Sequence, residues 1–352
     1  MKVNSKSKPL FPDKLSRAEN LIAHTPLIDL HIDSFIWTRI FGYDLQKSHA
    51  DSITQGYFAG QVDLPRLKAG GFSGAIWSIT TNPLRTSRAR AKAFEKNLDR
   101  FKKLIAKNSK QMKLISNSVD FDSIHSKDQQ AVWISIQGGN AIDYDLNLIE
   151  KYSEEITSVT LMHLMHSKLG TSMTPYPTLR KRGLTKFGRD FVKKLNEQRI
   201  FVDLAHADPR TFRDAVEVHD ASQPLLVSHT GVKGVYDCFR NIDDDQLKSI
   251  AATGGVIGVI YEPNFLGKGD AGESLEAVLR HLEHIQKIAG DDFTALGSDW
   301  DGMIIPTHGL RSADQFPTLV DLMQKRGWST SQIEKTLGLN FLRAFRQLRP
   351  GL

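Results

Sequence analysis

The sequence predicts an α/β fold, a closed (β/α)8 barrel of the TIM type, and two observations predict it. Eight short apolar runs rich in β-branched residues alternate with longer amphipathic stretches along the 352-residue chain, which is typical of a parallel sheet covered by helices. Polar side chains stand at or just beyond the carboxyl ends of most of these runs. A barrel gathers such residues into one mouth, whereas an open doubly wound sheet spreads them along a line. The polar residues therefore favour the barrel.

The expected strands, in chain order, are 27–33, 72–80, 131–137, 156–163, 199–206, 224–229, 254–261 and 293–299. Helical spacing lies between them, as in 87–107 and 243–254, and a further run at 112–117 predicts a short accessory strand. Long segments follow several strand ends, at 34–70, 164–183, 231–243, 262–273 and 301–316, and resemble substrate-covering loops. We expect one domain over 1–352, with residues 1–20 as an N-terminal extension.

Composition argues against several classes of partner. The chain has 46 Lys+Arg and 40 Asp+Glu, and because both signs are interleaved, the net charge of +6 favours neither nucleic acid nor membrane binding.

Cys238 is a single cysteine, which excludes an internal disulfide and a multi-thiolate metal site. The N-terminal residues lack the apolar run of a secretory signal, and 18 consecutive apolar residues occur nowhere. We expect a soluble, cytoplasmic protein.

A metal site is predicted from histidines at strand ends. His31 and Asp33 lie two residues apart, so on a strand they point to the same side. His163, His206 and His229 each follow a separate apolar run. One such histidine is most often a core residue, but several on one rim indicate a metal or a substrate. Nitrogen and oxygen donors without thiolate favour zinc, with manganese, iron and cobalt as alternatives.

An aspartate completes this candidate site. Asp299, in the segment GSDWDG, follows the last expected strand and is placed to handle the proton of a metal-activated water. Asp301 is the competing carboxylate, although an aspartate before Gly302 is more typical of a turn.

These segments resemble the membrane dipeptidase (renal dipeptidase) family of zinc metallopeptidases, peptidase family M19, over about residues 20–345. The matching motifs are DLHID, SIQGG, LMH, VDLAH, LVSHTG, CFRN, GVIGVIYEPNFL and GSDWDG. The resemblance implies a homodimeric, amidohydrolase-like barrel with two zinc ions that hydrolyses dipeptides, including those with a C-terminal D-residue. It implies His31 and Asp33 on one metal, His206 and His229 on the other, His163 and Asp299 around the scissile carbonyl and the water, and Arg240 on the substrate carboxylate.

One position departs from the family pattern. Where the family has a metal-bridging glutamate before two glycines, this chain has Gln137, Gly138 and Gly139. An amide offers one neutral oxygen, so we expect Gln137 to be a weak or non-bridging ligand and the second metal to bind less tightly. A pair of ions without the glutamate, a single zinc ion, and an impaired site with a binding role all remain open. Because every other polar group required is present, we expect a working hydrolase.

The predicted activity is metal-dependent hydrolysis of short dipeptides. His163 would donate to the developing oxyanion, and Arg240 would select a free carboxylate at a fixed distance. The alternatives are an amidohydrolase acting on another small amide or lactone, and a catalytically impaired metal-binding protein. The motifs of P-loop nucleotide binding, G-x-S-x-G serine hydrolases and H-E-x-x-H zincins do not occur in the sequence.

Overall fold

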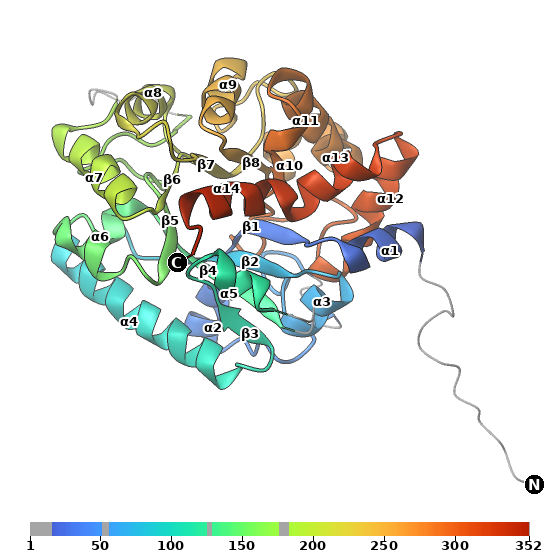
Figure 1. The fold of residues 1–352 in the computed structure, drawn as a ribbon, viewed down its shortest axis with the longest axis horizontal. Coiled ribbons are helices and arrows are strands. Elements are labelled where there is room, and N and C mark those ends of the chain that lie inside the picture. The colour runs from blue at the N-terminus through green and yellow to red at the C-terminus, as the bar shows by residue number, and fades with distance from the viewer. Residues whose placement is uncertain (1–15, 51–55, 125–128, 176–182, 352) are drawn as a thin grey trace, which may run out of the picture.

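Eight parallel strands form the predicted closed barrel in the computed structural model, which describes residues 16–50, 56–124, 129–175 and 183–351 (Figure 1). The strands are β1 (Ile28–Ile32), β2 (Gly74–Thr80), β4 (Gln130–Gln137), β5 (Ile156–Thr160), β6 (Phe201–Asp203), β7 (Leu226–Thr230), β8 (Val256–Val259) and β9 (Thr294–Leu296). Each pairs with the next, and β9 pairs with β1. The pairing of β2 with β4 completes the ring.

The ninth strand is an accessory strand, as predicted. β3 (Met112–Leu114) pairs with the first residues of β4, whereas β5 pairs with the second half of β4. Each part of that edge of β4 is therefore occupied by a different strand. β3 extends the sheet without entering the ring.

Helices surround the barrel in the way that βα alternation requires (Figure 1). They are α1 (Arg17–His24), α2 (Ser34–Phe41), α3 (Leu64–Ala69), α4 (Ser87–Lys107), α5 (Ser118–Asp122), α6 (Asn147–Lys151), α7 (Lys186–Glu197), α8 (Pro209–Val218), α9 (Asp244–Ala252), α10 (Pro263–Leu266), α11 (Leu275–Ile288), α12 (Pro317–Lys325), α13 (Thr330–Glu334) and α14 (Asn340–Leu348). Short 3-10 segments lie at Gly139–Ala141, Gly269–Ala271, Asp291–Phe293 and Ala313–Gln315, and a π-helical turn spans Lys335–Leu339. The expected helices at 87–107 and 243–254 correspond to α4 and α9.

The segment 34–70 is more regular than the loop expected from the sequence. It contains α2 and α3, and α2 starts directly after β1. The pattern SFIWTRIF buries only its first two residues, so it lacks the long apolar stripe that identifies a helix. Residues 51–55 of this segment and 176–182 of the segment 164–183 lie outside the described residues.

Helix α14 closes the amino-terminal end of the barrel. It crosses the barrel in Figure 1, and its residues Phe341 and Phe345 pack edge-on against Trp133 of β4. These three aromatic rings belong to a buried apolar cluster that includes residues of most barrel strands. Because this end is filled with side chains, the opposite face, where the strands end, is the place for a site.

The N-terminal boundary differs from the expected extension over residues 1–20. Ser16 caps α1 through a reciprocal pair of hydrogen bonds with Glu19, and Ala18 is fully buried where α1 packs on α12. Packed structure therefore begins inside the expected extension. None of the described helices is long and apolar enough to cross a membrane. The single-domain assignment over the whole chain, the dimer and the cytoplasmic location stay predictions.

Candidate metal and substrate site

A cavity of about 710 Å³ opens where the strands end, and most of the predicted site residues line it. The lining residues of this site cavity include Asp33, Gln137, His163, His206, Arg240 and Asp299. His31 and His229 are fully buried and contact this group. The fold therefore brings together all eight residues that sequence reasoning selected.

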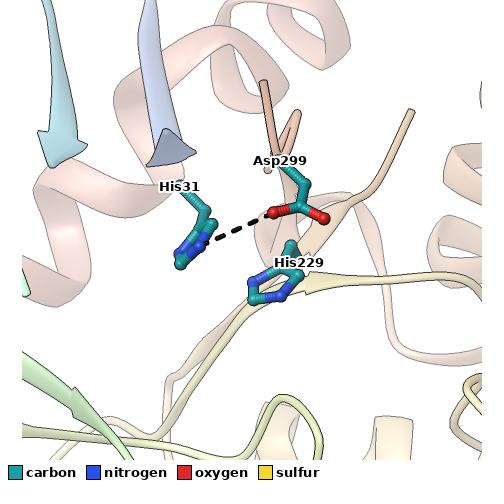
Figure 2. A group of neighbouring side chains, drawn as sticks. All are labelled: His31, His229 and Asp299. Carbon is teal, nitrogen blue, oxygen red and sulfur yellow. Dashed lines mark ion pairs between the residues drawn. The ribbon is translucent and has the colours of Figure 1, made fainter. Parts of the chain in front are cut away.

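Three side chains form a cluster of the size that a metal ion requires. His31, His229 and Asp299 each offer one ligand atom, and these atoms lie within 4.8 Å of one another. Figure 2 shows the three side chains converging from β1, from β7 and from the segment after β9. Nε2 of His31 lies 3.7 Å from Oδ1 of Asp299, and the two imidazole rings stack with centroids 4.0 Å apart.

This grouping differs from the one implied by the family resemblance. The resemblance implies that His31 and His229 bind different metal ions and that Asp299 lies beside the attacking water. Here, Asp299 lies close enough to both histidines to be a ligand itself. Two imidazoles and one carboxylate, with no thiolate, form a donor set that suits zinc.

Asp33 lies near the cluster although it is not part of strand β1. β1 ends at Ile32, and Asp33 is the residue immediately before α2, with φ −108° and ψ 11°. Its Oδ2 nevertheless lies 3.5 Å from Nε2 of His31. The predicted proximity is therefore present, but the turn into α2 produces it. Oδ1 of Asp33 is buried without a hydrogen-bond partner in the described part of the chain, which suits a metal ligand.

A second pair of donors lies beside the cluster. Nε2 of His206 is 2.9 Å from Nε2 of His229, close to the spacing of about 3.3 Å between two nitrogen ligands of one tetrahedral zinc ion with bonds of about 2.0–2.1 Å. His206 follows the end of β6 in the left-handed conformation, with φ +63°. Asp299 is also left-handed, with φ +62°. Such strained backbone turns both side chains into the site.

A hydrogen-bond chain sets the tautomer of His229. Asp203 accepts the hydroxyl of Ser228 at 2.6 Å and that of Thr160 at 2.6 Å. With its proton directed to Asp203, Ser228 Oγ can accept from Nδ1 of His229, 2.8 Å away. The lone pair of His229 then lies on Nε2, toward the cluster. Sequence reasoning missed Asp203, Ser228 and Thr160, although polar residues inside apolar strands were a visible signal.

Replacing Ser228 with alanine should lower the affinity for Zn²⁺ by about 10- to 100-fold, because the His229 ring would lose the acceptor that orients it. Competition with a fluorescent zinc chelator measures this affinity. Ser135→Ala is the matched control, since Ser135 is also buried on a barrel strand but its hydroxyl donates to the carbonyl of Trp77, at 3.4 Å. Equal affinities in the two variants would contradict the role of Ser228.

Gln137 is the last residue of β4 and is buried against His31. Its Nε2 lies 3.0 Å from Nε2 of His31, and its Oε1 accepts a hydrogen bond from Ser78 at 3.4 Å. An amide N–H directed at His31 occupies the lone pair that a cation would use. Gln137 must therefore turn its amide before its oxygen can face a metal.

Burial keeps most of the histidines in the neutral form that binds metals. It lowers the pKa of His163 to about 4, and it lowers the pKa values of His206 and His229 well below their usual range. Burial raises the pKa of Asp299 to about 7. Burial also opposes the ionisation of Asp33, but the hydrogen bond and charge of His31 outweigh it and lower the pKa of Asp33.

Arg240 brings an unused hydrogen-bond donor to the site cavity. The residue is 3 % exposed, and one of its terminal nitrogens, Nη2, donates to the carbonyl of His229 at 2.9 Å. The other, Nη1, is buried without a partner in the described ranges. Burial lowers the pKa of Arg240 to about 10, so the guanidinium stays charged at neutral pH. A buried, charged, partly unpaired guanidinium is suited to bind a carboxylate.

Asp301 stabilises the fold around the site and is not part of the cavity lining. It is fully buried, does not line the site cavity, and accepts hydrogen bonds from the hydroxyl of Ser34 and the backbone N–H of Gln61. It also adopts a left-handed backbone conformation, with φ +65°. Asp301 thus ties α2 and the segment before α3 to the turn that presents Asp299.

Barrel and site together define a metal-dependent hydrolase, because neutral imidazoles and carboxylates converge in one cavity at the carboxyl ends of the strands. A sequence model described as membrane dipeptidase (peptidase family M19) matches residues 15–350. The chain therefore belongs to the membrane dipeptidase family, which confirms the resemblance found in the motifs.

Known proteins are similar to this chain in sequence and in fold. The chain is 25% identical over 339 residues to Dipeptidase 3 of Macaca fascicularis, covering 95% of this chain and 67% of that protein. Its fold is similar to the probable dipeptidase PvdM of Pseudomonas aeruginosa, with TM-score 0.83, 18% identity, and 95% and 98% of the two chains covered. It is also similar to a metallopeptidase from Rhodobacter sphaeroides liganded with a phosphinate mimic of the dipeptide L-Ala-D-Ala, with TM-score 0.78, 23% identity, and 92% and 99% covered.

Proposed function

We propose that this protein hydrolyses short dipeptides, including those whose C-terminal residue has the D configuration. The observation that carries the proposal is a charged arginine, Arg240, whose unpaired N–H group lies in the same cavity as the cluster of candidate metal ligands. That pairing suits a substrate with an amide bond close to a free carboxylate. The mimic of L-Ala-D-Ala bound by the Rhodobacter sphaeroides relative supports the stereochemical part.

The metal ligands in this proposal are His31, Asp33, His206, His229 and Asp299, with Gln137 as a weak ligand. Bound zinc would supply Lewis-acid polarisation of the carbonyl and would lower the pKa of water. The chain itself supplies proton handling. Asp299 lies at the edge of the cavity, where its carboxylate can accept a proton from the attacking water.

His163 and Arg240 bind the substrate in this proposal. The neutral imidazole of His163 lines the cavity, so its N–H can donate to the oxygen of the scissile carbonyl as charge develops there. Nη1 of Arg240 donates to the C-terminal carboxylate. A third residue would place a neutral amide against this guanidinium, so a tripeptide should bind less well than a dipeptide.

Release of free amino acids from a dipeptide panel tests the function. The panel contains L-Ala-L-Ala, L-Ala-D-Ala and the corresponding tripeptides. We expect cleavage of both dipeptides, loss of activity on chelation, and recovery with Zn²⁺. A preparation that contains zinc and cleaves no dipeptide would overturn the peptidase assignment, and cleavage of lactones or cyclic amides by that preparation would identify the substrate class instead.

We further propose that one ion binds tightly and a second binds weakly, because Gln137 brings no negative charge to its place beside His31. Gln137→Glu should raise the zinc content from about one to about two ions per chain, since a carboxylate offsets the repulsion between two cations. Elemental analysis by mass spectrometry after dialysis measures this content. Ser135→Ala is the control and should leave the content unchanged, since Ser135 lies on the same strand as Gln137 and its hydroxyl donates to the carbonyl of Trp77.

A further inference from the structure

A second cavity, of about 430 Å³, adjoins the site cavity on the side of α2 and α4. The two cavities share four lining residues: Arg39, Ile40, Thr81 and Asn82. The two cavities therefore lie side by side around these four residues.

The second cavity is lined by positive charge. Its charged lining residues are Arg39 of α2, Arg85 of the segment after β2, and Lys96 and Arg100 of α4, and no carboxylate of the described residues lines it. We call these four residues the basic pocket. None of the four makes an ion pair with another described residue. By contrast, Lys102 and Lys103 of the same helix pair with Glu155 and Asp99 at 2.6 and 2.8 Å.

Of the four cations, Arg39 is partly buried, and Arg85, Lys96 and Arg100 are exposed. Lys96 and Arg100 lie one turn apart on α4, where like charges repel. Nε of Arg39 is buried without a hydrogen-bond partner in the described residues. Burial lowers the pKa of Arg39, and the charges of Arg100 and Arg85 lower it further. Asp33 acts in the opposite direction but faces the metal cluster. An anion in the pocket would relieve this repulsion.

The strand order places the basic pocket across the mouth from Arg240. Around the ring, β2 and β7 are separated by three strands in either direction, so they stand opposite each other. Thr81 and Asn82 follow β2, and Arg240 follows β7. With the C-terminal carboxylate on Arg240, the N-terminal residue of a dipeptide therefore extends toward the basic pocket.

We propose that the basic pocket binds an acidic side chain on the N-terminal residue of the substrate. This inference rests on the proposed dipeptidase function and names its substrate class: dipeptides that begin with an acidic residue such as glutamate. Arg39 lines both cavities and is the first cation such a side chain meets. Charge-assisted hydrogen bonds from guanidinium groups to a carboxylate supply the selectivity.

The pair of substrates Glu-Ala and Gln-Ala tests the proposal, because they differ in charge and hardly in size. We expect kcat/KM to favour Glu-Ala by about tenfold or more at low ionic strength, and this ratio should fall as salt is added. Arg39→Gln combined with Arg100→Gln should bring the ratio to about one. Arg88→Gln is the matched control on the exposed surface of α4 and should keep the original ratio.

Three results would overturn the proposal. The first two are a kcat/KM ratio of Glu-Ala to Gln-Ala near one in the unmodified protein and a ratio that the double substitution leaves unchanged. The third is a preference for Ala-Glu over Ala-Gln without a preference for Glu-Ala over Gln-Ala. Binding of Glu-Ala and Gln-Ala, measured by calorimetry, separates this proposal from the hydrolytic function. If no dipeptide is cleaved, the function fails, but tighter binding of Glu-Ala that disappears in the double variant still supports the pocket. Equal binding of both dipeptides contradicts it.

Discussion

Asp299→Asn should lower kcat for dipeptide hydrolysis by about a thousandfold, within the 100- to 10,000-fold contribution of a positioned general base. The carboxylate lies 3.7 Å from Nε2 of His31 and lines the cavity, so it can both face a metal ion and accept a proton. Asparagine keeps the size and the carbonyl oxygen but removes the basic group. The variant should therefore fold normally and lose turnover.

Steady-state kinetics, zinc content and thermal unfolding must be measured together for this variant. Asp301→Asn is the control, because Asp301 is buried two residues away and bonds Ser34 and Gln61 outside the cavity. Asp301→Asn should lower Tm and keep most of kcat. Asp299→Asn should keep Tm and lose most of kcat. If both variants lost activity in proportion to their loss of Tm, Asp299 would have a structural role only.

Arg240→Ala should lower kcat/KM for dipeptides by about a hundredfold or more, since it removes a buried charge-assisted contact to the substrate carboxylate. The effect should be specific to substrates with that carboxylate. A dipeptide with an amidated C-terminus gains nothing from the guanidinium, so its slow hydrolysis should change little. The measurement is the ratio of kcat/KM for the free and the amidated dipeptide in each protein.

Arg240→Lys tests the geometry of this contact. Lysine keeps the charge but lacks the planar fork, so it should recover only part of the lost kcat/KM. Because Nη2 of Arg240 also donates to the carbonyl of His229, zinc content must be compared across the variants. Equal losses for free and amidated dipeptides at normal zinc content would show that Arg240 does not bind the carboxylate.

The order of strands and helices followed from local patterns. All nine expected strands are present, and the helices α4 and α9 lie where amphipathic spacing placed them. Burial on both faces of a strand requires a continuous apolar run, and burial on one face of a helix requires a period near 3.6. α2 was missed because only Ser34 and Phe35 in it are buried.

The sequence predicted which residues form the site but only part of how they are arranged. The positions at strand ends identified His31, His163, His206 and His229, because barrels collect such residues at one face. The expected reason for the contact between His31 and Asp33 was wrong, since Asp33 lies in the turn before α2. The roles of the individual site residues stay predictions until the variants are measured.

The chain's own sequence determined the alternation of strands and helices, the polar residues at the strand ends and the uncharged amide at Gln137, because each depends on the residue type and its near neighbours. Tertiary structure alone decided that His31, His229 and Asp299 share one cluster, that Asp203 acts on His229 through Ser228, and that Arg39 and Arg100 face one cavity. Those contacts join residues far apart in the chain, and only closure of the barrel sets their distances.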